Sequence, residues 1–335
     1  MEFTAGGRLE VRITPADVGK RVSVRRLGEV GEPGGKFTDT VGVLTSWTDG
    51  VVVITRRNGE CVRIPEHSLV AGKVVPPAPA RRRGPAASYA ELARVSARAW
   101  QPVESERLGD WELRASSGYM RRLNSVLPLG DPGRPLDEAL TYVRQWYAAR
   151  GLPARIQAAT GAEGTQELLC AELAARGWER EVSAELHIGA LAPIADPNVD
   201  VDVSRVDLSR SCGEAWLRRY GRSGDLAPHV PKVLASGPSV WFASVPGSGD
   251  SMAAIGRCVV DGRWAGFMAV EVDPEHRRQG LATAVMTALA RQALSDGASA
   301  AWLQVEEGND GARALYGRMG FAAHHAHHHY RHGGA

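Results

Sequence analysis

The chain has 335 residues, which predicts two or three domains, and its 40 basic residues nearly balance its 38 acidic ones. The net charge of +2 gives no argument for nucleic acid or a membrane surface as a partner. No apolar run approaches the length of a bilayer span and the polar start is not a secretory signal, so we expect a cytoplasmic protein. The four cysteines lie far apart without metal-ligand spacing, which predicts reduced thiols rather than a disulfide or a zinc site.

Short strands dominate residues 1–75. The hairpin signals Asp49-Gly50 and Asn58-Gly59 separate apolar runs of strand length. The predicted strands are residues 22–26, 40–47, 51–55 and 61–64. This pattern predicts a small five-stranded β-barrel of the SH3-like type. Such barrels often bind protein partners, and Trp47 is interpreted either as a core or rim aromatic or as a ligand platform.

Residues 76–88 form a linker whose prolines exclude a regular strand or helix and predict an extended chain. Its three successive arginines, Arg81 to Arg83, either touch phosphates or belong to a solvated basic linker. No aromatic residue is interleaved with them, which favours the solvated linker.

Residues 89–190 alternate helices and strands, which predicts an α/β unit. The predicted helices are residues 90–100, 136–150 and 167–176, and the predicted strands are residues 111–115, 120–126, a segment near 156, and 181–188. Residues 172–178 form a helix closed by a glycine and an aromatic residue, and residues 314–321 repeat this pattern. The similarity predicts a degenerate internal repeat, whose first copy is structural or shapes the site of the second.

A second linker at residues 189–198 precedes a C-terminal domain at residues 200–332. The predicted helices there are residues 214–220, 281–297 and a short segment from 309, and the predicted strands are residues 240–245, 253–260, 264–273, 300–305 and 322–331. The last strand is rich in histidine, and its place after a glycine and an aromatic residue favours a strand over a metal site. Residues 221–238 are the candidate wall of a substrate pocket.

A short basic turn joins the strand that ends at Asp273-Pro274 to the helix that begins near Leu281. The turn reads Arg277-Arg278-Gln279-Gly280-Leu281-Ala282. The first N–H groups of a helix have no internal partner and lie at the positive end of the helix dipole, so they bind anions. Gly280 lets the backbone approach the anion, and the two arginines add positive charge. The turn therefore predicts a phosphate-binding site.

A second motif follows the strand predicted at residues 300–305. It reads Asn309-x-x-Ala312-x-x-Leu315-Tyr316-x-x-x-Gly320-Phe321. Together with the pattern Arg277-x-x-Gly280-x-Ala282, it resembles the GCN5-related N-acetyltransferase (GNAT) superfamily. The resemblance covers residues 200–332 and, more loosely, the whole chain, which is similar to an actinobacterial type with an SH3-like N-terminal domain. It implies an α/β (α+β) GNAT fold with a mixed central sheet, preceded by a small SH3-like β-barrel and a degenerate GNAT-like middle domain.

The resemblance implies an N-acetyltransferase that moves an acetyl group from acetyl-CoA directly to a primary amine of a small molecule, peptide or protein, without a metal. The backbone of the strand would pair with the pantetheine arm, and the turn would hold the pyrophosphate. The residues implied to bind acetyl-CoA are Val270, Val272, Arg277, Arg278, Gln279, Gly280, Leu281, Ala282, Thr283, Asn309 and Ala312. The first copy of the repeat lacks such a turn, so we expect a single acetyl-CoA site in the chain.

In an enzyme of this kind, Tyr316 would protonate the departing coenzyme A thiolate, although it is also interpreted as a core tyrosine. The general base is Glu271 on the strand beside the cofactor, Glu306 at the end of the next strand, or water. A different function class is a GNAT body that senses acyl-CoA or docks partners through the barrel without turnover. The intact Asn309 and Tyr316 favour the enzyme.

Overall fold

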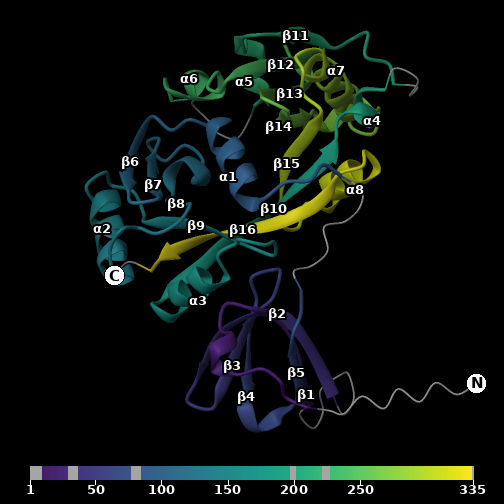
Figure 1. Cartoon of the computed structure of the whole chain (residues 1–335). Helices are drawn as coiled ribbons and strands as arrows, with labels where there is room; N and C mark the ends of the chain where they lie inside the picture. The colour runs from purple at the N-terminus through teal and green to yellow at the C-terminus, as the bar shows by residue number, and fades with distance from the viewer. Residues whose placement is uncertain (1–9, 29–36, 77–83, 197–200, 221–226, 334–335) are drawn as a thin grey trace, which may run out of the picture.

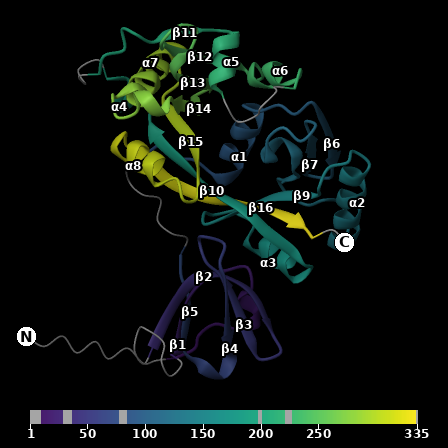
Figure 2. The same ribbon diagram turned by 180° about the vertical axis from the view of Figure 1, so that it is seen from behind.

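The computed structural model describes residues 10–28, 37–76, 84–196, 201–220 and 227–333 (Figure 1). A five-stranded sheet from the N-terminal residues lies at one end of the molecule, and a larger α/β body surrounds an eight-stranded sheet (Figure 1; Figure 2). The arginines of the predicted linker, Arg81 to Arg83, lie outside the described residues. In the described part of the chain, no helix is both long and apolar enough to cross a membrane.

The N-terminal sheet contains the strands that the sequence predicts for this region. They are β1 (Arg21–Leu27), β2 (Phe37–Thr48), β3 (Val51–Thr55), β4 (Cys61–Pro65) and β5 (Leu69–Val74), with the 3-10 helices η1 (Pro15–Asp17) and η2 (Glu66–Ser68). Trp47 packs against their aliphatic core, which confirms a core or rim aromatic. The order is β4-β3-β2-β1-β5, and within the described residues the two end strands do not pair with each other. The sheet is therefore open where a closed barrel was predicted, and Pro65 at the end of β4 lacks the N–H that a further partner would need.

The larger sheet is mixed. In spatial order its strands are β11 (Asp207–Ser209), β12 (Ser239–Pro246), β13 (Met252–Asp261), β14 (Trp264–Val272), β15 (Ala300–Glu306), β10 (Trp178–Ala190), β16 (Ala322–His332) and β9 (Arg155–Thr160). Neighbouring strands are antiparallel except β14 and β15, which are parallel. Along β12, Val240 and Phe242 pack on one face while Ala243 and Val245 pack on the other, as the two-residue period of a strand requires.

Helices cover both faces of this sheet. One face packs against α1 (Tyr89–Arg98), α5 (Glu214–Arg219) and α6 (Val230–Leu234), and we call it the α5 face. The other packs against α4 (Ala192–Ala195), α7 (Leu281–Ser295) and α8 (Asp310–Arg318), and we call it the α7 face. Helix α7 buries Leu281, Val285 and Leu289, which confirms the four-residue spacing that predicts it.

The middle part of the body, residues 84–190, adds a small three-stranded sheet. Its further elements are β6 (Glu104–Leu108), β7 (Trp111–Ala115), η3 (Arg121–Asn124), β8 (Leu127–Pro128), α2 (Leu136–Ala148) and α3 (Glu167–Ala175). The prediction of a strand at residues 120–126 is wrong, because most of that segment forms η3. The side chain of Asn124 makes four hydrogen bonds to the backbone of the loop before it, and these local bonds replace a strand ladder.

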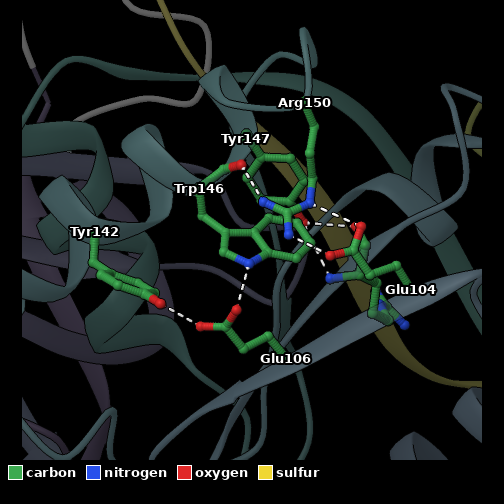
Figure 3. Close-up of polar contacts among 7 residues, drawn as sticks. Glu104, Glu106, Tyr142, Trp146, Tyr147 and Arg150 are labelled. Carbon is green, nitrogen blue, oxygen red and sulfur yellow. Dashed lines mark hydrogen bonds and ion pairs between the residues drawn. The ribbon is translucent and has the colours of Figure 1, made fainter.

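A polar network attaches α2 to β6 (Figure 3). Glu106 accepts hydrogen bonds from the Tyr142 hydroxyl and, at 2.8 Å, from the Trp146 indole N–H. Glu104 pairs with Arg150, whose guanidinium lies 3.5 Å from the centroid of the Trp146 ring. Because both carboxylates are engaged in holding the helix, this cluster is structural.

The middle part and the C-terminal part, which begins at residue 201, exchange their last strands. Strand β10, which follows α3, lies between β15 and β16, whereas β16, which follows α8, lies between β10 and β9. Two successive helix–strand units thus occupy equivalent places, as the sequence repeat predicts. The prediction of a linker at residues 189–198 is wrong for residues 189–196. Strand β10 runs to Ala190, and α4 begins two residues later. Residues 197–198 lie outside the described residues.

The turn between β3 and β4 docks the N-terminal sheet on these exchanged strands. Arg57 donates to the carbonyl oxygens of Ala323 and His324 at 2.9 and 3.1 Å. Gly59 has φ of +77, and a Cβ there would lie 2.6 Å from Nε2 of His328. Both the backbone conformation and the close approach require glycine, which confirms this residue as part of a tight turn.

Candidate active site

A gap opens between the parallel strands β14 and β15. Within the described residues their pairing ends at Phe267 and Leu303, although β14 continues to Val272 and β15 to Glu306. A β-bulge interrupts β14 at Ala269, which has φ of +51 and lies where the register with β13 shifts. Because a bulge bends its strand and increases the local twist, β14 turns away from β15. The backbone of β14 beyond Phe267 is left without a strand partner on the side of the gap.

The bulge also decides which side chains face which helices. Val270 and Val272 pack against the core of the α7 face. Glu271 lies on the α5 face, together with its register partner Ile255. Without the extra residue at Ala269, the alternation of the strand would turn Glu271 toward α7 instead. The backbone of β14 therefore faces the gap, and the half-buried carboxylate of Glu271 lies on the α5 face.

The two carboxylates considered as general bases share one face of the sheet. Trp302 of β15 packs on the α5 face, and Glu306, four residues further along the strand, points to the same side. Glu306 is exposed, whereas Glu271 is half-buried. The structure brings both acids to the α5 side of the sheet.

The turn between β14 and α7 presents a row of N–H groups. In the described structure, none of the N–H groups from Arg278 to Thr283 donates a hydrogen bond. Gly280, the N-cap of α7, has φ of +78, and Arg278 has φ of +63. Left-handed residues in such a turn direct successive N–H groups into one concavity, which suits an anion. Arg277 and Arg278 are exposed, and no acid of the described residues pairs with them.

Asp273 fixes the start of this turn. One carboxylate oxygen accepts from the N–H of Glu275 at 2.9 Å, and the other pairs with Arg219 at the end of α5. The hydrogen bond from Glu275, aided by the charge of Arg219, lowers the pKa of the Asp273 carboxyl. Sequence reasoning treats Asp273 and Pro274 only as a strand terminator. An aspartate before a proline is, however, also a signal for a helix N-cap, and η4 (Pro274–His276) begins there.

Helix α8 carries the second motif on the α7 face. Asn309 is its N-cap, and Oδ1 of that side chain accepts from the N–H of Ala312 at 3.1 Å. Ala312 and Tyr316, four residues apart, pack against the same core as α7. The Tyr316 ring meets Phe321 edge-on, 6.0 Å between centroids, and its hydroxyl has no hydrogen-bond partner among the described residues. Burial raises the pKa of Tyr316 to about 12, so the phenol stays protonated at neutral pH and can donate a proton.

The equivalent gap in the middle part is filled by a side chain. Strands β8 and β9 meet there only through one bridge, between Val126 and Ile156, in the described structure. Gln166 is the N-cap of α3, the place that Asn309 occupies in α8. Its Nε2 donates to the carbonyl of Pro128 beside the gap, and its Oε1 accepts from the N–H of Ala159 at 2.8 Å. Gln166 thus bridges the two separated strands.

The helix that follows this second gap is unsuited to an anion. Pro135 stands at the N-cap of α2 and has no N–H to offer. Asp137 and Glu138 lie in the first turn, where their negative charge would repel a phosphate. The sequence alone shows that the first copy of the repeat lacks a turn like that at residues 277–282. It does not show the role of Gln166, because the two strands that Gln166 bridges are far apart in the chain.

Other predictions for the site have mixed outcomes. The histidine-rich tail is strand β16, as predicted. All four cysteines are free, and no group of three or more metal-ligating side chains gathers among the described residues. In the predicted acceptor wall at residues 221–238, the first six residues lie outside the described residues, and α6 occupies Val230–Leu234.

Comparisons with known proteins identify relatives of the chain. A family model described as "Probable histone acetyltransferase Rv0428c C-terminal" matches residues 87–332. The chain is 27% identical over 309 residues to the Probable histone acetyltransferase Rv0428c of Mycobacterium tuberculosis, covering 92% of this chain and 93% of the relative. It is 25% identical over 247 residues to the Uncharacterized N-acetyltransferase YobR of Bacillus subtilis, covering 72% of this chain and 97% of that one.

Two solved structures share the fold. A GCN5-related N-acetyltransferase from Kribbella flavida has a TM-score of 0.54 at 17% identity, over 73% of this chain and 96% of that one. A tandem GNAT protein from the clavulanic acid biosynthesis pathway also has a TM-score of 0.54, at 14% identity, over 76% of this chain and 91% of that one.

Proposed function

The chain belongs to the family of the probable histone acetyltransferase Rv0428c C-terminal region, within the GNAT superfamily, and from this premise we propose that it acetylates a primary amine with acetyl-CoA. It is an acyltransferase of the GNAT type, as its relatives and structural neighbours are. One observation carries the proposal: two central strands of the sheet separate toward their carboxyl ends, and the turn after β14 presents a row of N–H groups without partners among the described residues. On the α7 face of the same sheet, α8 carries a tyrosine that stays protonated at neutral pH.

The donor would lie along β14. The unpaired backbone near Val270 and Val272 supports pairing with the amides of the pantetheine arm, in the manner of an added strand. The N–H groups from Arg278 to Thr283, with the charges of Arg277 and Arg278, support binding of the pyrophosphate. The Nδ2 group of Asn309 remains available to the arm, because Oδ1 caps the helix. The small side chain of Ala312 leaves room beside it.

The arrangement of acid and bases on opposite faces suits direct transfer in a ternary complex. A neutral amine approaches from the α5 face and forms a C–N bond with the thioester carbon, and the C–S bond then breaks. The Tyr316 hydroxyl, on the α7 face, gives its proton to the departing thiolate. The proton lost by the amine passes to Glu271, to Glu306 or to water. No other group is needed to balance the reaction.

Replacing Tyr316 by phenylalanine tests this function. We expect kcat for thiol release to fall by about 10² to 10³, because the leaving thiolate loses its proton donor. The Kd of acetyl-CoA should stay within about twofold, since the ring still packs against the core. Thiol release would be followed across a panel of amines and peptides.

Tyr142→Phe is the matched control, because it removes a tyrosine hydroxyl from the structural network between α2 and β6, outside the proposed site. An unchanged kcat in Tyr316→Phe would contradict the assigned role. Tight binding of acetyl-CoA without thiol release from the wild type, with any acceptor, would instead support a non-catalytic sensor.

A titration calorimetry experiment tests the number of donor sites. We expect one acetyl-CoA per chain, because Gln166 fills the second gap and α2 begins with acids. Gly280→Ala should weaken binding about tenfold, because a methyl group at the left-handed N-cap disturbs the anion-binding turn. Gly133 has φ of +74 in the turn before α2, so Gly133→Ala carries similar backbone strain and should leave the Kd unchanged. A stoichiometry of two, or equal effects of both substitutions, would contradict the single site.

A further inference from the structure

A loop of the middle part reaches the α5 face of the C-terminal part. It runs from residue 116 to residue 124 and contains two non-glycine residues in the left-handed region, Ser117 with φ of +48 and Met120 with φ of +59. Asn124 holds this conformation: it accepts from the N–H groups of Ser116 and Gly118 and donates to the carbonyls of Tyr119 and Met120. Backbone strain persists where surrounding bonds over-determine it, and such sites gather where a side chain must be aimed at a ligand.

A short hydrogen-bonded chain joins this loop to the end of α5. The Tyr119 hydroxyl donates to the Tyr220 hydroxyl at 3.2 Å, and Tyr220 in turn donates to the sulfur of Met120 at 3.9 Å. The Tyr119 ring also meets the ring of His229, which precedes α6, at 6.1 Å between centroids. Both tyrosines are buried, whereas Met120 is half-buried. Tyr220 therefore holds the Met120 thioether directly, and Tyr119 holds Tyr220.

Met120 packs against the core of the α5 face, the face on which Glu271 lies. Met252 and Ala269 pack against the same cluster, and Ala269 is the bulge residue of β14, two positions after the last pair with β15. Glu271, the next residue of β14 on this face, comes two positions later. In the proposed reaction the amine enters from this face, so Met120 lies on the same side of the sheet as the acceptor.

The same chain of contacts continues to the donor side. Arg219 precedes Tyr220 in the sequence and pairs with Asp273, which caps the start of the anion-binding turn. The end of α5 thus contacts the loop of the middle part on one side and the turn between β14 and α7 on the other. A displacement of Met120 would leave that turn in place, because the N–H of Glu275 also holds Asp273.

From these contacts we propose that Met120 is a specificity-determining contact for the acceptor and that Tyr119 and Tyr220 position it. The inference rests on the proposed amine acetylation. A thioether is apolar, polarisable and adaptable, so it fits an amine whose body is aromatic or aliphatic, such as an arylalkylamine. The middle part, which has no donor site of its own, would then select the acceptor for the C-terminal part.

The test compares acceptors at saturating acetyl-CoA, with 2-phenylethylamine, glucosamine and a lysine peptide as probes. We expect the wild type to prefer 2-phenylethylamine. Met120→Ala should raise the KM for that amine about tenfold, with kcat and the KM for acetyl-CoA within about twofold, because only contact with the acceptor body is lost. Met120→Leu, which keeps the volume, should restore the KM to within about threefold.

Tyr220→Phe separates positioning from folding. It should raise the KM for 2-phenylethylamine, and the increase should vanish in the Met120→Ala background, because Tyr220 acts through Met120. Val103→Ala, which truncates an exposed side chain of the middle part, is the control and should change neither KM.

Two results with Met120→Ala would overturn the inference itself. One is a KM for 2-phenylethylamine that stays within twofold in Met120→Ala, and another is an equal rise in the KM for acetyl-CoA. A wild type that turns over but prefers glucosamine or the peptide would overturn the apolar class alone. A wild type that releases no thiol with any amine would instead overturn the proposed function, and the inference with it.

Discussion

We expect the free energy of unfolding to fall by about 5 kcal/mol when the pH is lowered from 7.0 to 5.5. The cause is strand β16, which lies between two neighbours in the larger sheet and carries a run of histidines. Four of them are buried, with at most 6% of each residue exposed: His325, His327, His328 and His329. Protonating any of them in the folded state places a charge in the interior.

The direction of the effect follows from their pKa values. Burial lowers the pKa of His325 to about 3 and that of His328 to about 4. Burial, with the positive charge of Arg122 nearby, lowers the pKa values of His327 and His329 well below the ordinary range. In the unfolded chain the same side chains titrate near pH 6.5. The unfolded state therefore binds more protons between about pH 6.5 and pH 4, so stability is full above this window and is lost as the pH falls through it.

The size of the effect is large compared with the stability of a domain. Each histidine contributes about 1.2 kcal/mol of the loss at pH 5.5, and natural domains are stable by about 5–15 kcal/mol in total. Urea unfolding at pH 7.0, 6.0 and 5.5 measures the loss. Its slope near pH 5.5 should correspond to an uptake of about three to four protons on unfolding.

Two single substitutions make this measurement specific. His329→Gln removes one buried histidine and should lower the proton uptake by about one. His67 is exposed in η2, and His67→Gln is the matched surface control. An uptake below one proton in the wild type would show that the buried histidines titrate normally in the folded state.

The second large effect concerns the exchanged strand β10. A fragment of residues 196–335 contains every residue assigned to the donor site, yet we expect it not to fold. In the described structure β16 pairs with β10 and β9 alone, and both lie outside the fragment. Strand β15, which borders the gap, would lose β10 as well.

The number of lost contacts explains the size of this effect. Strand β10 has seven register pairs with β15 and ten with β16. Strand β10 also packs closely against Phe321, because a Cβ at Gly189 would lie 3.4 Å from Cδ1 of that ring. A hydrogen bond contributes a net of about 0.5–1.5 kcal/mol, so the loss of two ladders exceeds the stability of most domains.

Circular dichroism and thermal melting of purified fragments measure this outcome. A fragment of residues 84–335 keeps both exchanged strands and should melt cooperatively. Co-expression of residues 84–195 with residues 196–335 should recover a soluble complex, because the two strands can pair between chains. Cooperative melting of residues 196–335 alone would contradict the structural role of β10.

Much of this protein follows from short stretches of its sequence. The hairpin turn at Gly59, the helix that begins at Leu281 and the cap at Asn309 are each set by residues within one or two turns of one another. Glycine conformations, apolar spacing and helix capping act over that range, so they can be predicted without knowledge of the rest of the fold. For the same reason the turn at residues 277–283 and the motif of α8 already point to the superfamily in the sequence.

The tertiary structure decided what depends on partners distant in the chain. The strand predicted at residues 120–126 became a loop held by Asn124, and the bulge at Ala269 turned Glu271 to the α5 face. Gln166 closed the second gap, and the last strands were exchanged between the two parts. Strand periodicity shows that a residue faces a core but not which core, because the neighbour of a strand is selected by hydrogen bonding and packing with segments more than a hundred residues away.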